Sequence, residues 1–395
     1  MISVEEALHF IDSNKKSFGI ETVPLLSCLH RTLATDVIAD RDFPPFDRVT
    51  MDGIAISSEA FLKGQKQFII EKISAAGSVE QTLDNKTHCI EVMTGSMLPL
   101  NTDAVIPYEQ CEIKDGVADV NTETVTVFQN IHRKGTDEKE GAVLLKKNTR
   151  ISPAHISIMA TVGMGEVEVY KLPSVAIFST GDELVTVDQT PLPHQIRQSN
   201  VYFLAADLQR EKVNASLYHL QDDKEAMKQT VQEKLEQYDT ILLSGAVSKG
   251  KYDFLPQVLE ELGIKTIFHR VSQRPGKPFL LGAIGGKMIF GFPGNPVSTF
   301  VCYHVYCKRW LLQSLHQPIQ KLTAKLADDI ALSSPLTNHV LVKIRYNEGE
   351  CLADPMFFST SGDIPSLLGA DGIISLPAGK NQFQKGDIFE VILCR

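Results

Sequence analysis

The sequence contains no uninterrupted apolar run of about 18 residues, the length that marks a membrane-spanning helix. Its opening residues, MISVEE, lack the basic and then apolar pattern of a secretory signal. We therefore expect a protein that neither spans a membrane nor is exported.

Cysteines are few and show no pairing pattern. There are seven, an odd number, and no C-x-x-C occurs. This argues against a disulfide scaffold and against a structural zinc site. A reducing compartment fits best, so we expect a cytoplasmic protein.

No block rich in Lys or Arg stands out, and 39 basic residues face 48 acidic ones, for a net charge of −9. Nucleic acid is therefore not expected as a partner. An anionic ligand would need cations placed locally.

The chain is long enough, at 395 residues with 43% apolar residues, for roughly two to four domains. Ser3 and Glu6 have capping-box spacing and predict an opening helix. A second helical piece is predicted near residues 25–33. Short Val-, Ile- and Thr-rich runs then predict strands at 67–73, 89–93 and 124–128, and a helix is predicted from Ser152 to about residue 162.

Between residues 173 and 316, strand and helix patterns alternate, which predicts a mostly parallel sheet covered by helices. Strand patterns return at 339–346, 372–376 and 388–393. The predicted fold class is multidomain α/β plus β. The predicted domains are an N-terminal elongated helical and linker domain (1–50 and 133–172), an inserted small β domain (51–132), the central α/β domain (173–317) and a C-terminal, barrel-like β domain (318–395).

Three glycine-punctuated loops follow short apolar runs in the α/β region. They are FSTGDEL (178–184), SGAVSKG (244–250) and PGNPVS (293–298). Ligands of open α/β sheets bind beyond the carboxyl ends of the strands, so these loops are expected to converge on one crevice. Their hydroxyls, backbone N–H groups and carboxylates suit a phosphate-bearing ligand held with a hard cation.

The second loop nearly matches the sequence pattern of a nucleotide P-loop, because Gly245, Gly250 and Lys251 have the required spacing. Tyr252 stands where a Ser or Thr would bind magnesium, which disfavours an ATP-dependent kinase or ligase. A different phosphate loop that uses Ser244 and Ser248 is more plausible, and a plain glycine-rich turn remains an alternative.

Carboxylates gather at the predicted strand ends. Asp182 and Glu183 follow the first strand, and Asp222 and Asp253 occupy similar positions. One acidic residue at such a place is usually a helix N-cap, a role that suits Asp222. Four carboxylates that converge without His or Cys predict a magnesium site.

Positive charge is available in RVSQRPGKP (270–278), between two predicted strands. Arg side chains bind oxyanions in bidentate fashion, although surface charges on a hairpin are an equal alternative. Cys302, His304 and Cys307 do not share one helix face and are interpreted as core residues rather than a metal site.

Taken in chain order, these segments resemble the molybdopterin molybdenumtransferase family, which includes the bacterial MoeA proteins and the matching domain of gephyrin. The segments that carry the resemblance are FPPFD (43–47), MDG (51–53), MTG (93–95), GTD (135–137), STGDEL (179–184), SGAVSKG (244–250) with Asp253, RPGKP (274–278), FPGNPVS (292–298) and SGD (361–363). They cover essentially the whole chain.

The resemblance implies an L-shaped homodimer whose active site lies in a MoaB/MogA-like α/β domain and is completed by the inserted domain across the dimer. It implies adenylylated molybdopterin and molybdate as substrates, a magnesium or similar divalent ion, release of AMP, and contact with the adenylyltransferase partner. The implied catalytic residues are Asp52, Thr94, Glu183, Asp222 and Asp253, of which Glu183, Asp222 and Asp253 hold the metal. The expected substrate-binding residues are Thr180, Gly181, Ser244, Gly245, Ser248, Arg270, Arg274, Lys277, Pro293, Pro296 and Ser361.

The chain departs from the family at Ala246, where a second Gly is usual, and at Arg270 and Arg274, where Lys is common. One alternative with the same fold is a paralogue that handles tungstate or another pterin. A non-catalytic scaffold is a further alternative, since gephyrin's matching domain also binds receptor peptides. A scaffold would not need Glu183, Asp222 and Asp253 together, which favours an enzyme.

Overall fold

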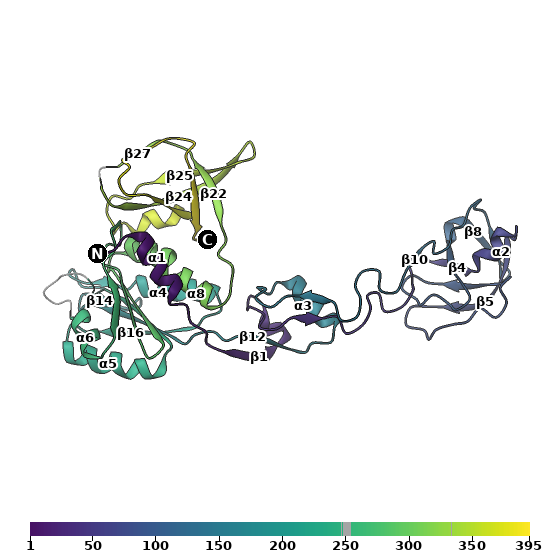
Figure 1. The fold of residues 1–395 in the computed structure, drawn as a ribbon, viewed down its shortest axis with the longest axis horizontal. Coiled ribbons are helices and arrows are strands. Elements are labelled where there is room, and N and C mark those ends of the chain that lie inside the picture. Colours follow the sequence, from purple (N-terminus) through teal and green to yellow (C-terminus); the bar gives the residue numbers. More distant parts are fainter. Residues whose placement is uncertain (246, 248–253, 333) are drawn as a thin grey trace. The chain divides into compact units, whose positions relative to one another are not determined.

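The computed structural model describes residues 1–245, 247, 254–332 and 334–395, and the chain forms two compact units (Figure 1). The first unit comprises Met1–Ala34, Asn148–Ser152 and Glu166–Arg395, and the second comprises Thr35–Lys147 and Pro153–Gly165. No helix within these described ranges combines the length and apolarity needed to cross a bilayer. The finer division into four domains stays a prediction.

A six-stranded sheet forms the centre of the first unit, with the order β16-β13-β17-β21-β20-β18. Its strands are β13 (Val175–Thr180), β16 (Ala215–Leu220), β17 (Thr240–Ser244), β18 (Lys265–His269), β20 (Leu280–Ile284) and β21 (Lys287–Phe292). β16, β13, β17 and β21 are parallel, and β20 and β18 form an antiparallel edge. The predicted, mostly parallel sheet is confirmed.

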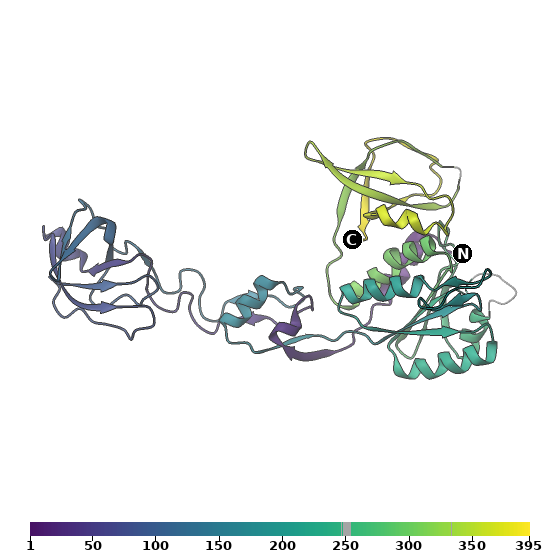
Figure 2. The ribbon, with the colours of Figure 1, turned by 180° about the vertical axis from the view of Figure 1, so that it is seen from behind.

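Helices cover both faces of this sheet because successive strand residues point to opposite sides. Phe178 and Leu243 pack in the core on the side of α5 (Lys224–Gln237) and α6 (Leu255–Glu261). Ile177 and Leu242 pack in the core on the side of α1, α4, α7 and α8 (Figures 1 and 2). The bounds on that side are α1 (Val4–Ser13), α4 (Asn200–Arg210), α7 (Pro296–Cys302) and α8 (Lys308–Ser314).

The segment that joins α7 to α8 is a π-helical turn, η3 (Tyr303–Cys307), which the sequence did not predict. Cys302, His304 and Cys307 are buried, so their interpretation as core residues is confirmed. Across the described part of the chain, no group of three or more His, Cys, Asp or Glu side chains is arranged to hold a metal ion.

A second six-stranded sheet occupies the C-terminal part of the first unit, with the order β19-β24-β25-β22-β28-β26. Its strands are β19 (Gln273–Arg274), β22 (Leu322–Leu326), β24 (Thr337–Asn347), β25 (Glu350–Met356), β26 (Gly372–Leu376) and β28 (Ile388–Leu393). A further pairing of β24 with β26 closes the five longer strands into a ring. The short pair β23 (Ile330–Ala331) and β27 (Gln382–Phe383) and the turn η4 (Ile364–Gly369) complete this part. The predicted barrel-like β region is confirmed.

The predicted second helical piece at 25–33 is wrong beyond its first turn. Only a short 3-10 turn forms there, η1 (Leu25–Cys28), after β1 (Ile20–Pro24), which pairs with β12 (Glu166–Tyr170). His30 has φ 67° and its N–H donates to the Ile151 carbonyl at 3.0 Å. Pairing with a distant segment therefore overrides local helix propensity.

The second unit is built on a six-stranded sheet with the order β7-β4-β6-β5-β9-β8. Its elements are β4 (Gly53–Ile56), α2 (Ser58–Leu62), β5 (Gln67–Ser74), β6 (Cys89–Val92), β7 (Ala104–Pro107), η2 (Tyr108–Gln110), β8 (Cys111–Lys114) and β9 (Val117–Val120). It also holds the pairs β2 (Val37–Ile38) with β11 (Val143–Leu145) and β3 (Arg48–Val49) with β10 (Ile131–His132), and the helix α3 (Pro153–Thr161), which was predicted. The predicted strand at 124–128 is wrong: the chain turns there, Phe128 has φ 63°, and its N–H donates to the Asp103 carbonyl at 2.7 Å.

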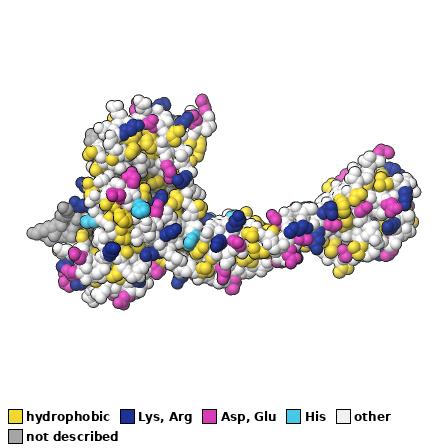
Figure 3. Space-filling view, in the orientation of Figure 1, with side chains coloured by type: hydrophobic (Ala, Val, Ile, Leu, Met, Phe, Trp, Pro, Cys, Tyr) yellow, Lys and Arg dark blue, Asp and Glu magenta, His cyan; other side chains and the backbone are white. Residues whose placement is uncertain are grey.

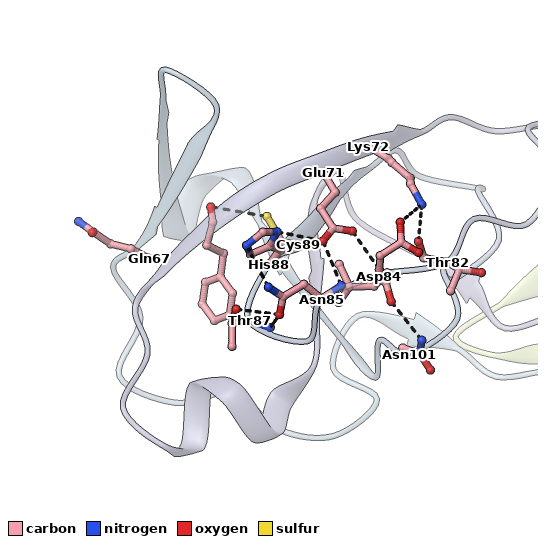
Figure 4. Close-up of polar contacts among 12 residues, drawn as sticks. Gln67, Glu71, Lys72, Thr82, Asp84, Asn85, Thr87, His88, Cys89 and Asn101 are labelled. Carbon is pink, nitrogen blue, oxygen red and sulfur yellow. Dashed lines mark hydrogen bonds and ion pairs between the residues drawn. The ribbon is translucent and has the colours of Figure 1, made fainter.

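The loop between β5 and β6 is fastened to β5 by one carboxylate (Figure 4). Glu71 accepts hydrogen bonds from the backbone N–H groups of Asp84, at 2.9 Å, and Asn85, at 3.0 Å, and contacts His88 Nδ1 at 2.9 Å. Lys72 adds an ion pair to Asp84 at 2.7 Å. This loop leads directly into β6, the strand that precedes Thr94.

Together, the sheets and helices of the two units confirm the predicted fold class, multidomain α/β plus β.

Candidate active site

The carboxyl ends of the four parallel strands meet at one edge of the α/β sheet. In the register of the sheet, Thr180 lies beside Leu220, Ser179 beside Ser244, and Ser244 beside Phe292. The three glycine-punctuated loops begin at these residues, so their starting points lie together at one sheet edge, as predicted. Residues 246 and 248–250 of the second loop lie outside the described residues.

Hydrogen bonds tie these loops to one another. Thr180 Oγ1 donates to the Ser244 carbonyl at 3.3 Å, and the Gly245 N–H donates to the Phe292 carbonyl at 3.0 Å. Asn200, at the start of α4, donates through Nδ2 to Ser244 Oγ at 2.9 Å and to the Gly294 carbonyl at 2.7 Å. The sequence did not single out Asn200, because nothing local distinguishes it from an ordinary residue at a helix start.

Two glycines leave space that the site uses. Gly245 has φ 102°, and a Cβ there would meet Thr180 Oγ1 and lie 3.0 Å from the Thr180 carbonyl oxygen. Gly181 has φ 128°, and its Cβ would meet the Glu183 carboxylate, with Oε1 at 2.7 Å. Glycine at 181 therefore lets the Glu183 carboxylate lie back over the end of β13.

Glu183 and Asp182 are exposed, and Asp222 is half-buried. The backbone N–H of Asp222 donates to Asp182 Oδ1 at 3.1 Å, which joins the first loop to the end of β16. The short parallel pair β14 (Leu184–Val185) and β15 (Ile196–Arg197) follows, and the Ile196 N–H donates to the Glu183 carbonyl at 2.9 Å. The Glu183 carbonyl is thus held by β15, and the side chain of the preceding Asp182 by the backbone of Asp222.

Asp222 is not the helix cap that the sequence predicted. Asp223 caps α5, because its Oδ1 accepts the Ala226 N–H at 2.8 Å. This correction leaves the Asp222 carboxylate outside the capping role. Asp253, the third predicted metal ligand, and Ser248, a predicted ligand-binding residue, lie outside the described residues.

The third loop is joined to the C-terminal β region through Ser361. Asn295 Nδ2 donates to Ser361 Oγ at 2.6 Å, and the Val297 N–H donates to the Ser361 carbonyl at 3.0 Å. Pro293 is buried, its carbonyl accepts Thr299 Oγ1 at 2.6 Å, and Pro296 begins α7. Ser361 is far along the chain from Pro293 and Pro296, yet the fold brings it to their loop.

The predicted cationic residues lie between β18 and β20. Arg270 is half-buried and has φ 78°, and Arg274 and Lys277 are exposed. Within the described residues, none of these three side chains forms an ion pair or a hydrogen bond with any other residue. Elsewhere, basic and acidic side chains are interspersed over the face drawn in Figure 3. Three cations without a carboxylate partner in the described chain are suited to an external anion.

Asp52 and Thr94 form a pair of their own in the second unit. Both are exposed, and Asp52 Oδ1 accepts hydrogen bonds from Thr94 Oγ1 and from the Thr94 N–H, each at 2.6 Å. These two bonds, the hydroxyl's first, hold the pKa of the Asp52 carboxyl below its ordinary value. The carboxylate is thereby kept ionised and fixed in direction.

The sheet edge thus combines hydroxyl groups, exposed carboxylates and the Asn200 amide, which bridges two loops. A neighbouring loop of the same unit carries cations that have no ion-pair partner among the described residues. Oxygen donors of this kind suit a hard divalent ion, and hydroxyls with cations suit a phosphate group. Such a set can bind a phosphorylated small molecule and act on it.

Known proteins match the chain over its whole length. The profile of the MoeA N-terminal region (domain I and II) matches residues 2–163, a probable molybdopterin binding domain matches residues 176–313, and the MoeA C-terminal region (domain IV) matches residues 323–394. The molybdopterin molybdenumtransferase of a Synechocystis strain is 38% identical over 98% of this chain and 99% of its own length. That of Bacillus subtilis is 31% identical over 100% of this chain and 94% of its own.

A solved structure has the same fold throughout. The molybdopterin biosynthesis MoeA protein from Pyrococcus horikosii superposes with a TM-score of 0.85 at 30% identity, covering 100% of this chain and 99% of that one. With three family profiles and full-length relatives in agreement with the geometry of the sheet edge, this chain belongs to the molybdopterin molybdenumtransferase (MoeA) family, a family of transferases in molybdenum cofactor biosynthesis.

Proposed function

We propose that the chain takes adenylylated molybdopterin, releases AMP in a magnesium-dependent step and inserts molybdenum from molybdate. The observation that carries the proposal is the convergence of three loops at the carboxyl edge of the α/β sheet, tied together by Thr180, Ser244 and Asn200. That edge is where an α/β sheet binds nucleotide-like and phosphorylated ligands.

Glu183, Asp222 and Asp253 would hold the divalent ion, since all three are oxygen donors. Glu183 and Asp222 follow β13 and β16, which are neighbouring strands. The space beside Gly181, which the Glu183 carboxylate fills, supports this role for Glu183. The bound ion would offset the negative charge that develops on the phosphate groups during cleavage.

The chain's own residues would orient the substrate and stabilise its charge. Arg270, Arg274 and Lys277 would neutralise the anionic groups, and Ser248 and Ser244 would donate hydrogen bonds to phosphate. Thr180, Gly181 and Gly245 would shape the floor of the site, and Pro293, Pro296 and Ser361 its third side. The unpaired state of the three cations in the described chain supports this assignment.

We further propose a cytoplasmic homodimer in which Asp52 and Thr94 of one subunit complete the site of the other, and which contacts the adenylyltransferase that supplies its substrate. The exposure and tight mutual pairing of Asp52 and Thr94 support a role outside their own core. Sedimentation velocity tests the dimer: we expect a dimer with activity, and a fully active monomer would contradict it.

The test of the reaction is AMP release from adenylylated molybdopterin by the purified protein with magnesium, run with molybdate, with tungstate and with neither oxyanion. We expect release that yields active cofactor with molybdate. Equal or better activity with tungstate would point to the tungsten paralogue. Bound substrate with no release from a folded protein would overturn the catalytic assignment and favour a scaffold.

A further inference from the structure

A buried chain of hydrogen bonds lies directly beneath the loop between β18 and β20 that carries Arg270, Arg274 and Lys277, and Gln273 is at the centre of this chain. Gln273 is fully buried, with 0% of its surface exposed, and belongs to β19, which pairs with β24 of the C-terminal sheet. It immediately precedes Arg274, and Lys277 lies four residues after Gln273. The side chain of Gln273 thus points inward where its neighbour's points to solvent.

The amide nitrogen of Gln273 holds the turn of the loop. Nε2 donates to the Gly276 carbonyl at 3.2 Å and to Cys302 Sγ at 3.4 Å. Gly276 has φ 85°, and a Cβ there would meet Cys302 Sγ and lie 2.9 Å from Gln273 Nε2. The glycine therefore allows the backbone to approach the amide closely enough for this contact.

The amide oxygen of Gln273 accepts two further hydrogen bonds. Tyr306 Oη donates one, and His339 Nε2 lies 3.2 Å from the same oxygen. An amide oxygen only accepts, so His339 carries its proton on Nε2, and its Nδ1, 2.9 Å from Ser375 Oγ, accepts the serine hydroxyl. Burial lowers the pKa of His339 to about 4, which keeps the ring neutral at pH 7. The hydrogen bonds to Gln273 and Ser375 set the tautomer.

Every polar atom of the Gln273 amide therefore has a partner, and apart from Gly276 the partners come from three other elements. Cys302 lies in α7, Tyr306 in the π-helical turn and His339 in β24. Ser375 of β26 extends the network through His339. A fully satisfied buried network fixes one arrangement, because any other leaves a buried donor or acceptor unpaired. Two backbone bonds close the same loop, from Val271 N–H to the Lys277 carbonyl at 2.9 Å and from Arg270 N–H to the Phe279 carbonyl at 2.9 Å.

We infer that Gln273 is a positioning residue, whose buried amide holds the Gly276 carbonyl and so aims Arg274 and Lys277 at the anionic groups of the substrate. The inference rests on the proposed function. Gln273 itself is too deeply buried to touch a ligand. Its effect on the ligand passes through the two cations of the loop that it holds.

The test compares Gln273→Glu with Lys277→Ala. Glu has the shape of Gln but lacks the amide protons, so as a carboxylate it leaves the Gly276 carbonyl without a donor. We expect Gln273→Glu to raise the Kd of adenylylated molybdopterin, measured without magnesium or molybdate, and its KM by about tenfold each. We expect kcat to change less than about twofold, and hydrogen exchange at the backbone amides of 274–279 to become faster.

Lys277→Ala separates failure of the proposed function from failure of the positioning role of Gln273. If Lys277→Ala leaves the Kd unchanged, the loop does not bind the substrate and its assignment in the proposed function fails. If Lys277→Ala weakens binding but Gln273→Glu does not, only the positioning role is overturned. A fall in kcat at unchanged KM would also overturn it.

Tyr306→Phe is a second variant in case the buried carboxyl group that Gln273→Glu introduces prevents folding. It keeps the ring and removes one hydrogen bond to the Gln273 oxygen. We expect a smaller change in the same direction, about two- to threefold in KM, with faster exchange in 274–279. Unchanged exchange and unchanged KM in a folded Tyr306→Phe protein would contradict the inference.

Discussion

Asp52 and Thr94, which are 42 residues apart in the sequence, are joined by two hydrogen bonds of 2.6 Å to a single carboxylate oxygen. One bond comes from the threonine hydroxyl and the other from its backbone N–H. The pairing links the turn before β4 to the turn after β6, two strands that are neighbours in the sheet.

Replacing Thr94 by Val removes the hydroxyl bond and keeps both the side-chain shape and the backbone bond. We expect the pKa of Asp52 to rise toward its ordinary value of 3.8, because the side-chain bond from Thr94 is the largest cause of its depression. The carboxyl carbon resonance of Asp52, followed through a pH titration by NMR, measures the change, and Thr94→Ser should keep the depressed value.

The same bond has a definite sign in stability. A depressed pKa in the folded state stabilises that state above the ordinary pKa, and the contribution is lost as the pH falls through the folded value. A stability difference between Thr94→Val and the parent is therefore expected at neutral pH and should shrink in acid. A difference that grows as the pH falls would contradict this account.

Glu183→Gln keeps the size of the side chain and removes its charge. We expect turnover to fall by roughly 10²-fold or more, the range typical for loss of a group that acts directly in catalysis. The side chain is exposed, so the fold should be unaffected. AMP release measures the effect, and Glu236→Gln on the exposed side of α5 is the matched control. Normal AMP release in Glu183→Gln would remove Glu183 from the mechanism.

Gly245→Ala should destabilise the first unit, because φ at residue 245 is 102° and the new Cβ would meet the Thr180 side chain. We expect a loss of roughly 2–4 kcal/mol in the free energy of unfolding. Gly263→Ala, with φ 73° and open space around it, is the control and should cost roughly 1–2 kcal/mol. The single tryptophan, Trp310, is buried in this unit and reports its unfolding in urea. Equal losses in the two variants would show that the contact with Thr180 is unimportant.

Asn200→Ala removes the amide that bridges the second and third loops. We expect the KM for adenylylated molybdopterin to rise about tenfold, since two hydrogen bonds that hold ligand loops are lost. Asn214→Ala, at an exposed position before β16, is the control. An unchanged KM in Asn200→Ala would mean that the loops keep their positions without it.

Because of His304, we expect the core of the first unit to be sensitive to acid. Burial lowers its pKa from 6.5 to about 3, so the folded state binds fewer protons than the unfolded state between these values. Stability is therefore expected to fall as the pH drops below about 6.5, by at most ~1.4 kcal/mol per pH unit from this group. His304→Phe should reduce the loss between pH 7 and pH 5 in urea unfolding followed by Trp310, whereas His194→Phe, at an exposed position, should not.

Some elements were predictable because their signals are local. The capping box of Ser3 and Glu6 is present as predicted, and the alternation of strand and helix patterns from 173 onward correctly indicated the mostly parallel sheet. The segment 25–33 and the segment 124–128 failed for one reason. Their propensities favoured helix and strand, but hydrogen bonds to residues far along the chain turned the backbone at His30 and Phe128.

The fold class and the family could be read from the amino-acid order alone, because periodicity, caps and motifs in chain order depend on neighbouring residues. Most of the residues that the strand ends bring together could be named in the same way. Which side chains hold them became apparent only in the folded chain. Asn200 reaches Ser244 across 44 positions, and His339 reaches Gln273 across 66. Such hydrogen bonds depend on distances in the folded chain, which no local pattern of residues encodes.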